Sequence, residues 1–86
     1  MRAEVGRRFL INGNLYEVTR VDVTGEAGRI ELTPRSRSSE WEREMREFAT
    51  DNRKDPEAVL AVNRHRPMYV DEPWFRRPDV KEVTDG

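Results

Sequence analysis

The chain contains no cysteine and no glutamine, a single histidine, and no apolar run near the roughly 18 residues that span a membrane. Without cysteine there is no disulfide framework, no thiolate nucleophile and no cysteine-ligated metal site. Small secreted domains usually depend on disulfides, so this absence favours a cytoplasmic protein. A charged leader followed by an apolar segment is also missing, and we therefore expect no targeting signal and no membrane partner.

Charged residues make up 38% of the 86 residues and hydrophobic residues 35%, with a formal net charge of −1. Fourteen of the sixteen basic residues are arginine, a bias that a GC-rich genome explains most simply. The alternatives are carboxylate recognition by the guanidinium fork and adaptation to heat, although heat-adapted proteins tend to gain lysine. The apolar residues are clustered and periodic, which predicts one small folded domain over residues 1–78 and a disordered tail over residues 79–86.

The stretch RFLINGNLYEV, residues 8–18, predicts a β-hairpin. Asn12 and Gly13 both tolerate positive φ and suit a two-residue type I′ turn. With this turn, Arg8 lies opposite Glu17 and forms an ion pair on the outer face. Four apolar residues then share the inner face: Phe9, Ile11, Tyr16 and Val18.

The alternation of apolar and polar residues slips after Val18, which predicts a bulge near residues 19–20. Residues 24–28 predict a turn, and residues 29–33 predict a third strand that Pro34 ends. Three short antiparallel strands with a bent middle strand resemble a curled meander or the start of a small SH3-like barrel. That likeness is one of shape alone, because fold does not imply function.

Two helices are predicted after the sheet, so the fold class is α+β. Ser39 and Glu42 form a capping box, and the first helix ends near Asn52. Asp55 begins a second helix over residues 56–64, because proline is favoured in the first helical turn. We expect both helices to cover one face of the sheet. The apolar stripe of the first helix would face the strands, with its tryptophan buried: Trp41, Met45, Phe48 and Ala49.

Residues that carry catalysis or bind metal are not found together in the sequence. Residues 51–55 resemble a calcium-binding loop, but the required glycine is missing and Arg53 occupies a ligand position, so helix capping explains them better. His65 lies between Arg64 and Arg66, whose charges would repel a metal ion. No glycine-rich loop with a phosphate-binding context occurs. We therefore expect no enzyme, no cofactor and no metal site.

Arginine clusters suggest nucleic acid as an alternative partner, since arginine contacts phosphate and aromatic rings stack on bases. Residues 1–37 carry a net charge of +2 and the remainder −3, so the chain lacks the strong positive balance of nucleic-acid-binding domains. The alternative is a small-barrel nucleic-acid-binding module. It would use four arginines on or near the sheet: Arg35, Arg37, Arg76 and Arg77.

Two adjacent aromatic residues, Trp74 and Phe75, lie between prolines after a candidate fourth strand at residues 68–70. They either fold back over the small core or form a rigid docking segment together with Arg76 and Arg77. In an extended chain the two rings would point in opposite directions, so that one could anchor the segment while the other meets a partner.

By elimination, the sequence favours a small non-catalytic protein-binding protein. Adaptor, assembly and inhibitor proteins are of this kind, including accessory proteins of phages and mobile elements. The expected partner is another protein or a second copy of the chain. The expected protein interface is the segment just described: Trp74, Phe75, Arg76 and Arg77.

Overall fold

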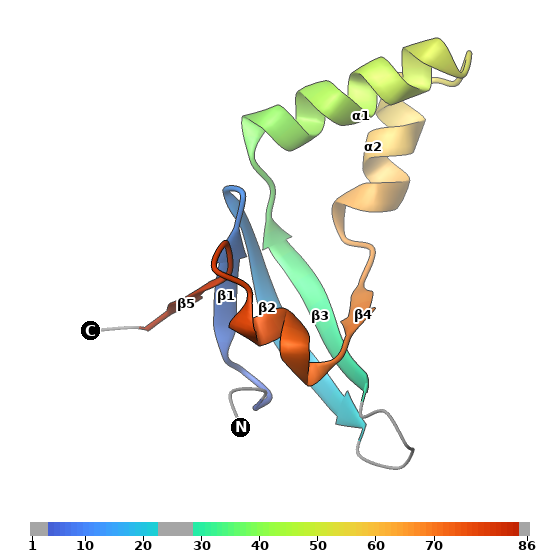
Figure 1. Ribbon diagram of the computed structural model, residues 1–86. Helices are drawn as coiled ribbons and strands as arrows, with labels where there is room; N and C mark the ends of the chain where they lie inside the picture. The colour runs from blue at the N-terminus through green and yellow to red at the C-terminus, as the bar shows by residue number, and fades with distance from the viewer. Residues whose placement is uncertain (1–3, 23–28, 85–86) are drawn as a thin grey trace.

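The computed structural model describes residues 4–22 and 29–84, and the predicted turn at residues 24–28 lies outside them (Figure 1). The α+β class is confirmed, but the sheet has five strands where three were predicted, and it is open where a barrel was considered. Its antiparallel strands follow the order β4-β3-β2-β1-β5. The elements along the chain are β1 (Arg8–Ile11), β2 (Asn14–Asp22), β3 (Arg29–Ser36), α1 (Ser39–Asp51), α2 (Pro56–Arg64), β4 (Met68–Val70), the 3-10 helix η1 (Glu72–Arg76) and β5 (Lys81–Val83).

The predicted β1–β2 hairpin is confirmed in its register and in its turn. Phe9 pairs with Tyr16, and Arg8 pairs with Glu17. Asn12 and Gly13 have φ values of 51° and 78°, as a type I′ turn requires. Local turn chemistry therefore sets the register of the first two strands.

Strands β2 and β3 form the longest pairing of the sheet and contain two register shifts. The first lies between Val18 and Arg20, where the sequence predicts a bulge. The second lies between Leu15 and Tyr16, opposite the end of β3. Pro34 sits beside this second shift and is buried, so β3 continues to Ser36 and does not end at the proline as predicted. Proline is tolerated there because a bulge interrupts the ladder of hydrogen bonds.

Both edges of the sheet are strands of three residues. The candidate strand at Met68–Val70 is confirmed as β4, which pairs with β3. Residues Lys81–Val83 form β5, which pairs with β1, although the sequence predicts disorder from residue 79 onward. That prediction is wrong for these residues because Val80 is buried in the core and holds the following segment against β1.

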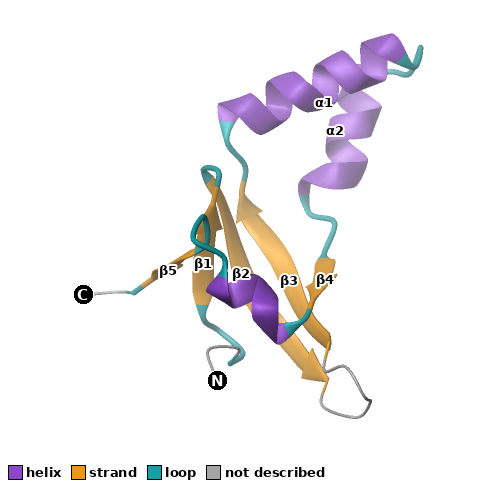
Figure 2. Cartoon of the chain, viewed as in Figure 1, coloured by secondary structure: helices purple, strands orange, loops and turns teal. Residues whose placement is uncertain are grey.

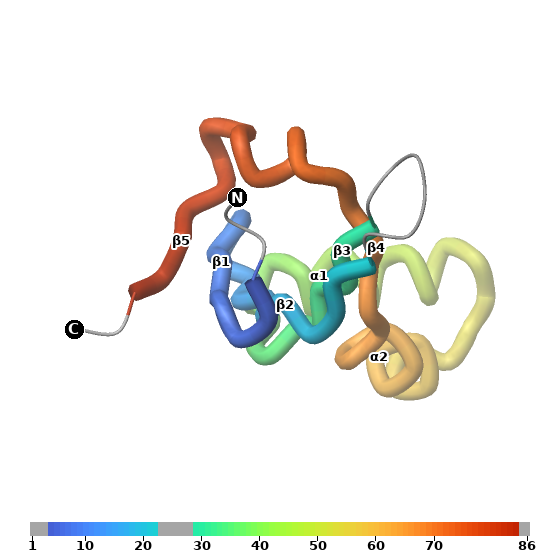
Figure 3. Tube along the Cα trace, turned by 90° about the horizontal axis from the view of Figure 1, so that it is seen from below, coloured from blue at the N-terminus to red at the C-terminus, as the bar shows by residue number. Residues whose placement is uncertain are grey.

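The hydrophobic core lies on one face of the sheet, which we call the inner face, and η1 covers it (Figures 1 and 3). The Phe75 ring meets the Phe9 ring edge-on, with 4.8 Å between centroids. Buried aromatic pairs of this geometry contribute beyond their buried area. The core thus joins all parts of the sheet to the C-terminal segment: Phe9, Tyr16, Val18, Ile30, Leu32, Phe75 and Val80.

The helices α1 and α2 form a hairpin that projects from one end of the sheet (Figures 1 and 2). They do not cover a face of the sheet, which corrects the sequence prediction. The molecule is consequently elongated, with extents of 41 × 33 × 20 Å. Among the described residues, no helix is both long and apolar enough to cross a membrane.

Candidate functional site

Arg37 fastens the helical hairpin to the sheet from the short link between β3 and α1. Its guanidinium donates to the backbone carbonyls of Asn63 at 3.0 Å and Arg64 at 3.2 Å, at the C-terminal end of α2. It also donates to the Tyr16 hydroxyl at 2.7 Å and lies 4.5 Å from the Trp41 ring centroid. A cation is favoured at a helix C-terminus, and the planar fork can serve several acceptors at once.

The β1–β2 turn holds the first residue of this link. The buried Asn14 side chain accepts a hydrogen bond from the Ser38 amide at 2.9 Å. The Ser38 hydroxyl in turn accepts from the Trp41 amide, so Ser38 is the N-cap of α1, one residue before the predicted Ser39. A Cβ atom added to Gly13 would come within 3.0 Å of Ser38 Cβ. We call the four residues at this contact the joint: Asn14, Tyr16, Arg37 and Ser38.

The two helices contact each other through small and apolar side chains flanked by charges. Ala49 of α1 and Leu60 of α2 are buried in the hairpin. On one side of this contact, which we call the ionic side, two ion pairs bridge the helices. These pairs are Arg46 with Glu57 and Arg64 with Glu42.

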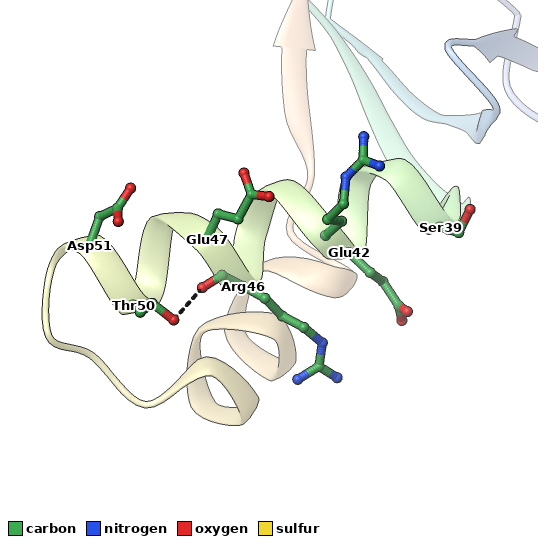
Figure 4. Close-up of a pocket in the computed structure, with 7 residues that line it drawn as sticks. Ser39, Glu42, Arg46, Glu47, Thr50 and Asp51 are labelled. Atoms are coloured by element: carbon green, nitrogen blue, oxygen red, sulfur yellow. Dashed lines mark hydrogen bonds between the residues drawn. The ribbon is translucent and has the colours of Figure 1, made fainter.

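Figure 4 shows a hollow of about 600 Å³ along α1. Glu42 and Arg46 extend to one side of the helix, whereas Glu47 and Asp51 extend to the other. The Thr50 hydroxyl donates back to the Arg46 carbonyl at 3.0 Å. Only polar side chains of a single helix line this hollow, so it offers no apolar surface to a ligand.

The opposite side of the hairpin carries an apolar groove of about 540 Å³, which we call the helical groove. The Phe48 side chain of α1 is 48% exposed there, and the Val62 side chain of α2 is 68% exposed. Nothing in the described residues covers either side chain. The lining consists of Phe48, Lys54, Asp55, Ala58, Val59, Val62, Asn63 and Arg66.

Two cations stand at the rim of the helical groove, one before α2 and one after it. Lys54 lies 6.0 Å from the Phe48 ring centroid, and Arg66 follows the end of α2. Neither forms an ion pair with another described residue. The one acid at the rim, Asp55, accepts a hydrogen bond from the Glu57 amide and thereby caps α2. We call Lys54 and Arg66 the rim cations.

The apolar surface continues from the helical groove toward the sheet. A second hollow of about 350 Å³ shares Asn63 and Arg66 with the groove, and its lining includes Trp41 and Met45. The predicted apolar stripe of α1 is therefore present, but its three large residues are only partly covered. Trp41 was expected to be buried against the strands, and it is instead half-buried beneath the Arg37 guanidinium.

The segment predicted as a protein interface is mainly a lid over the core. Phe75 is 2% exposed, and Trp74 packs against the same cluster. The idea that the two rings point apart fails because the segment is a 3-10 helix and not an extended chain. Arg76 pairs with Glu72, and Arg77 makes two hydrogen bonds to Asp79 at 2.7 and 3.1 Å, so neither cation lacks an acid.

The four arginines considered for nucleic acid do not form one surface. Arg35 pairs with Glu17 at 3.2 Å on the outer face of the sheet, where Glu17 also accepts from Arg8. Arg37 belongs to the joint. Arg76 and Arg77 adjoin η1 on the inner face. Each of the four thus has a partner within the protein.

A chain of hydrogen bonds crosses the outer face between β2, β3 and β4. The Glu31 carboxylate accepts from the Thr19 hydroxyl at 2.7 Å and from the Tyr69 hydroxyl at 3.0 Å. These bonds, that from Thr19 first, lower the pKa of Glu31, and the same carboxylate raises the pKa of Tyr69. Hydrogen bonding by Arg35 lowers the pKa of Glu17. Such shifts are typical of structural pairs on a solvated sheet.

The described residues contain no group of three or more histidine, aspartate or glutamate side chains that could hold a metal ion. His65 is exposed at the C-cap of α2, and Asp51 and Asp55 lie at the ends of the two helices. The residues that resemble a calcium-binding loop therefore have capping positions. No family model, curated protein or solved structure matches the chain.

Sequence reasoning missed Lys54, Val62 and Arg66 as candidate binding residues. A signal was present, since residues 58–62 are five consecutive apolar residues in a short helix. A helix packed on one side can bury only one stripe of side chains. At least one apolar side chain of α2 must therefore face away from α1.

Proposed function

We propose that this chain is a small non-catalytic protein-binding protein and that the helical groove is its binding surface. The observation that carries the proposal is the exposure of Phe48 and Val62 in one groove. Contiguous apolar surface on a small protein commonly marks an interaction site. Grooves between helices are a recurrent binding mode for peptides and helices.

The energetic gain from covering this groove is substantial for a small interface. Complete burial of a valine or phenylalanine side chain contributes about 1.5–3 kcal/mol each. The partly exposed Trp41 and Met45 extend the same surface toward the sheet. A partner that covers both hollows would therefore gain several such contributions, partly offset by the entropy lost on association.

The arrangement of the arginines weighs against the nucleic-acid alternative. Binding through phosphates needs cations that can exchange their solution counterions for phosphate. Arg35, Arg76 and Arg77 are neutralised by acids of the protein, and Arg37 is engaged in the joint. We expect mixed duplex and single strands to bind weakly at low salt and not at all at physiological salt.

The proposal is tested by affinity capture from a lysate of the source organism with matched variants. Phe48→Gln combined with Val62→Gln removes the apolar groove and keeps good helix formers. Leu10→Thr combined with Val83→Thr is the control, because both residues are 38% exposed on the outer face of the sheet. Protein and nucleic acid in each eluate are identified, and melting temperatures show that the variants are folded.

We expect the wild type and the control variant to retain the same protein and the groove variant to lose it. Retention of that protein by a folded groove variant would contradict the proposal. Specific recovery of nucleic acid by all three proteins would favour the alternative.

A further inference from the structure

The shape and charge of the helical groove restrict what can occupy it. Its floor runs along α2 from Ala58 to Arg66, a length of about 12 Å at 1.5 Å per residue. The apolar side chains lie in the middle, and the rim cations lie one at each end of α2. An occupant that matches this pattern has apolar side chains at its centre and carboxylates about two helical turns apart.

The walls of the groove also decide the secondary structure of the occupant. They are side chains of two helices, whose backbone amides and carbonyls are already paired within each helix. An extended segment would find no strand edge there and would leave its own backbone groups without partners. A helix satisfies its backbone internally, and its side chains at i, i+3 or i+4, and i+7 can enter such a groove.

We propose that the helical groove binds an acidic amphipathic helix of another protein, with carboxylates that pair with Lys54 and Arg66. This inference rests on the proposed function and names the chemistry of the partner. Both cations lack an acidic partner among the described residues, and Asp55 is occupied as a helix cap. Charge complementarity at the rim then selects the partner, while the apolar centre supplies affinity.

A second copy of the chain fits the groove less well. Its α1 is amphipathic, but that helix is already packed on α2 through Ala49 and two interhelical ion pairs. Its large apolar residue Phe48 is itself a wall of the groove. A symmetric contact between two grooves would also bring four rim cations into one interface.

The test uses two synthetic helical peptides with identical apolar residues at i, i+4 and i+7. Glutamate flanks the apolar residues in one peptide and lysine in the other. Binding to the full-length protein is measured by calorimetry, and NMR shift changes locate the bound peptide. We expect the acidic peptide to bind at least about tenfold more tightly, with an advantage that shrinks as salt is raised.

Charge reversal of the rim is the decisive variant. Lys54→Glu with Arg66→Glu should invert the preference so that the lysine peptide binds better. Lys81→Glu with Arg43→Glu changes the net charge equally, but those residues lie on β5 and on the ionic side, so the acidic peptide should remain preferred. Equal binding of both peptides, no binding of either, or shift changes outside the groove would overturn the inference.

Two further outcomes separate this inference from the proposed function. If the glutamine variant of Phe48 and Val62 loses its natural partner while neither peptide is preferred, the groove binds protein but not an acidic helix. If sedimentation shows a dimer that the same variant abolishes, the occupant is a second copy. Either result would sink the inference and leave the helical groove as a binding surface.

Discussion

The sheet and the helical hairpin use their apolar residues in different ways. The large inner-face residues of the sheet, such as Phe9, Val18 and Leu32, are fully buried beneath η1. In the hairpin only Ala49 and Leu60 are buried, and larger side chains remain partly or largely exposed. The sheet is thus held together by its core, whereas the hairpin is attached mainly through polar contacts.

This difference shows how a small domain can keep an apolar surface available. A domain of this size buries only a modest fraction of its surface, and η1 completes the core of the sheet without the helices. Arg37 and Ser38 then hold the hairpin away from the sheet by hydrogen bonds. The apolar face of the hairpin remains free to bind another molecule because the sheet does not need it.

The largest expected effect comes from the core beneath η1. Phe75→Ala should lower the free energy of unfolding by about 3–5 kcal/mol, since it leaves a cavity against Phe9. Phe48→Ala is the matched control in the hairpin and should cost less than about 1 kcal/mol, because the side chain is half exposed. Urea denaturation followed by circular dichroism measures both. Equal losses would abolish the proposed difference between the two regions.

The joint should come next. Arg37→Ala removes the donor to two carbonyls and one hydroxyl, and we expect a loss of about 2–3 kcal/mol. Arg37→Lys should recover little of this, because an ammonium group lacks the planar fork. Hydrogen exchange gives the sharper readout: amides of α1 and α2 should lose protection while those of β2 and β3 keep theirs. Uniform loss of protection would mean that the hairpin and the sheet unfold as one unit.

The same joint can be tested from the side of the sheet. Gly13→Val introduces a β-branched residue at a φ of 78° and a Cβ atom 3.0 Å from Ser38 Cβ, so we expect a loss of about 1–3 kcal/mol. Asn12→Gly should be tolerated, because glycine readily adopts the φ of 51° found there. Thermal melts compare the two variants. An unchanged melting temperature for Gly13→Val would show that the turn moves away from α1 without cost.

The smallest expected effect concerns the outer face and pH. The pKa of Glu31 is lower in the folded protein than in the unfolded chain, so the folded state binds fewer protons at this site. Its contribution to stability is therefore complete above the ordinary glutamate pKa of about 4.3 and is lost as the pH falls through the lower folded value. Thr19→Val should raise the pKa of Glu31 more than Tyr69→Phe does, since the Thr19 bond is the larger cause.

NMR titration of the carboxyl carbons checks this order. Glu17 is the internal control, because Arg35 and Arg8 lower its pKa and neither variant removes them. A larger shift with Tyr69→Phe than with Thr19→Val would reverse the assignment of causes.

Elements that depend on neighbouring residues could be predicted from the sequence. Asn12 and Gly13 specify the hairpin, and the slip in alternation after Val18 marks the bulge. Asp55 with the following proline marks the start of α2. The N-cap of α1 was misplaced by one residue because Asn14, 24 residues away, holds Ser38 and not Ser39.

The candidate site could be predicted only in part. The apolar stripe of α1 was visible in the sequence, but its exposure was not, since periodicity shows which residues share a face and not what covers that face. Phe75 was considered for an interface and proved to be core. Arg37 was considered for nucleic acid and proved to fasten the hairpin.

The sequence by itself determined the α+β class, the first hairpin and the extent of α2, because turns, caps and side-chain periodicity act over a few residues. Only the tertiary structure decided the pairing of β5 with β1 and the position of η1 over the core. It also decided that the helices project beyond the sheet. These features depend on contacts between residues far apart in the chain, such as Phe9 with Phe75 and Tyr16 with Arg37, whose energies no local pattern encodes.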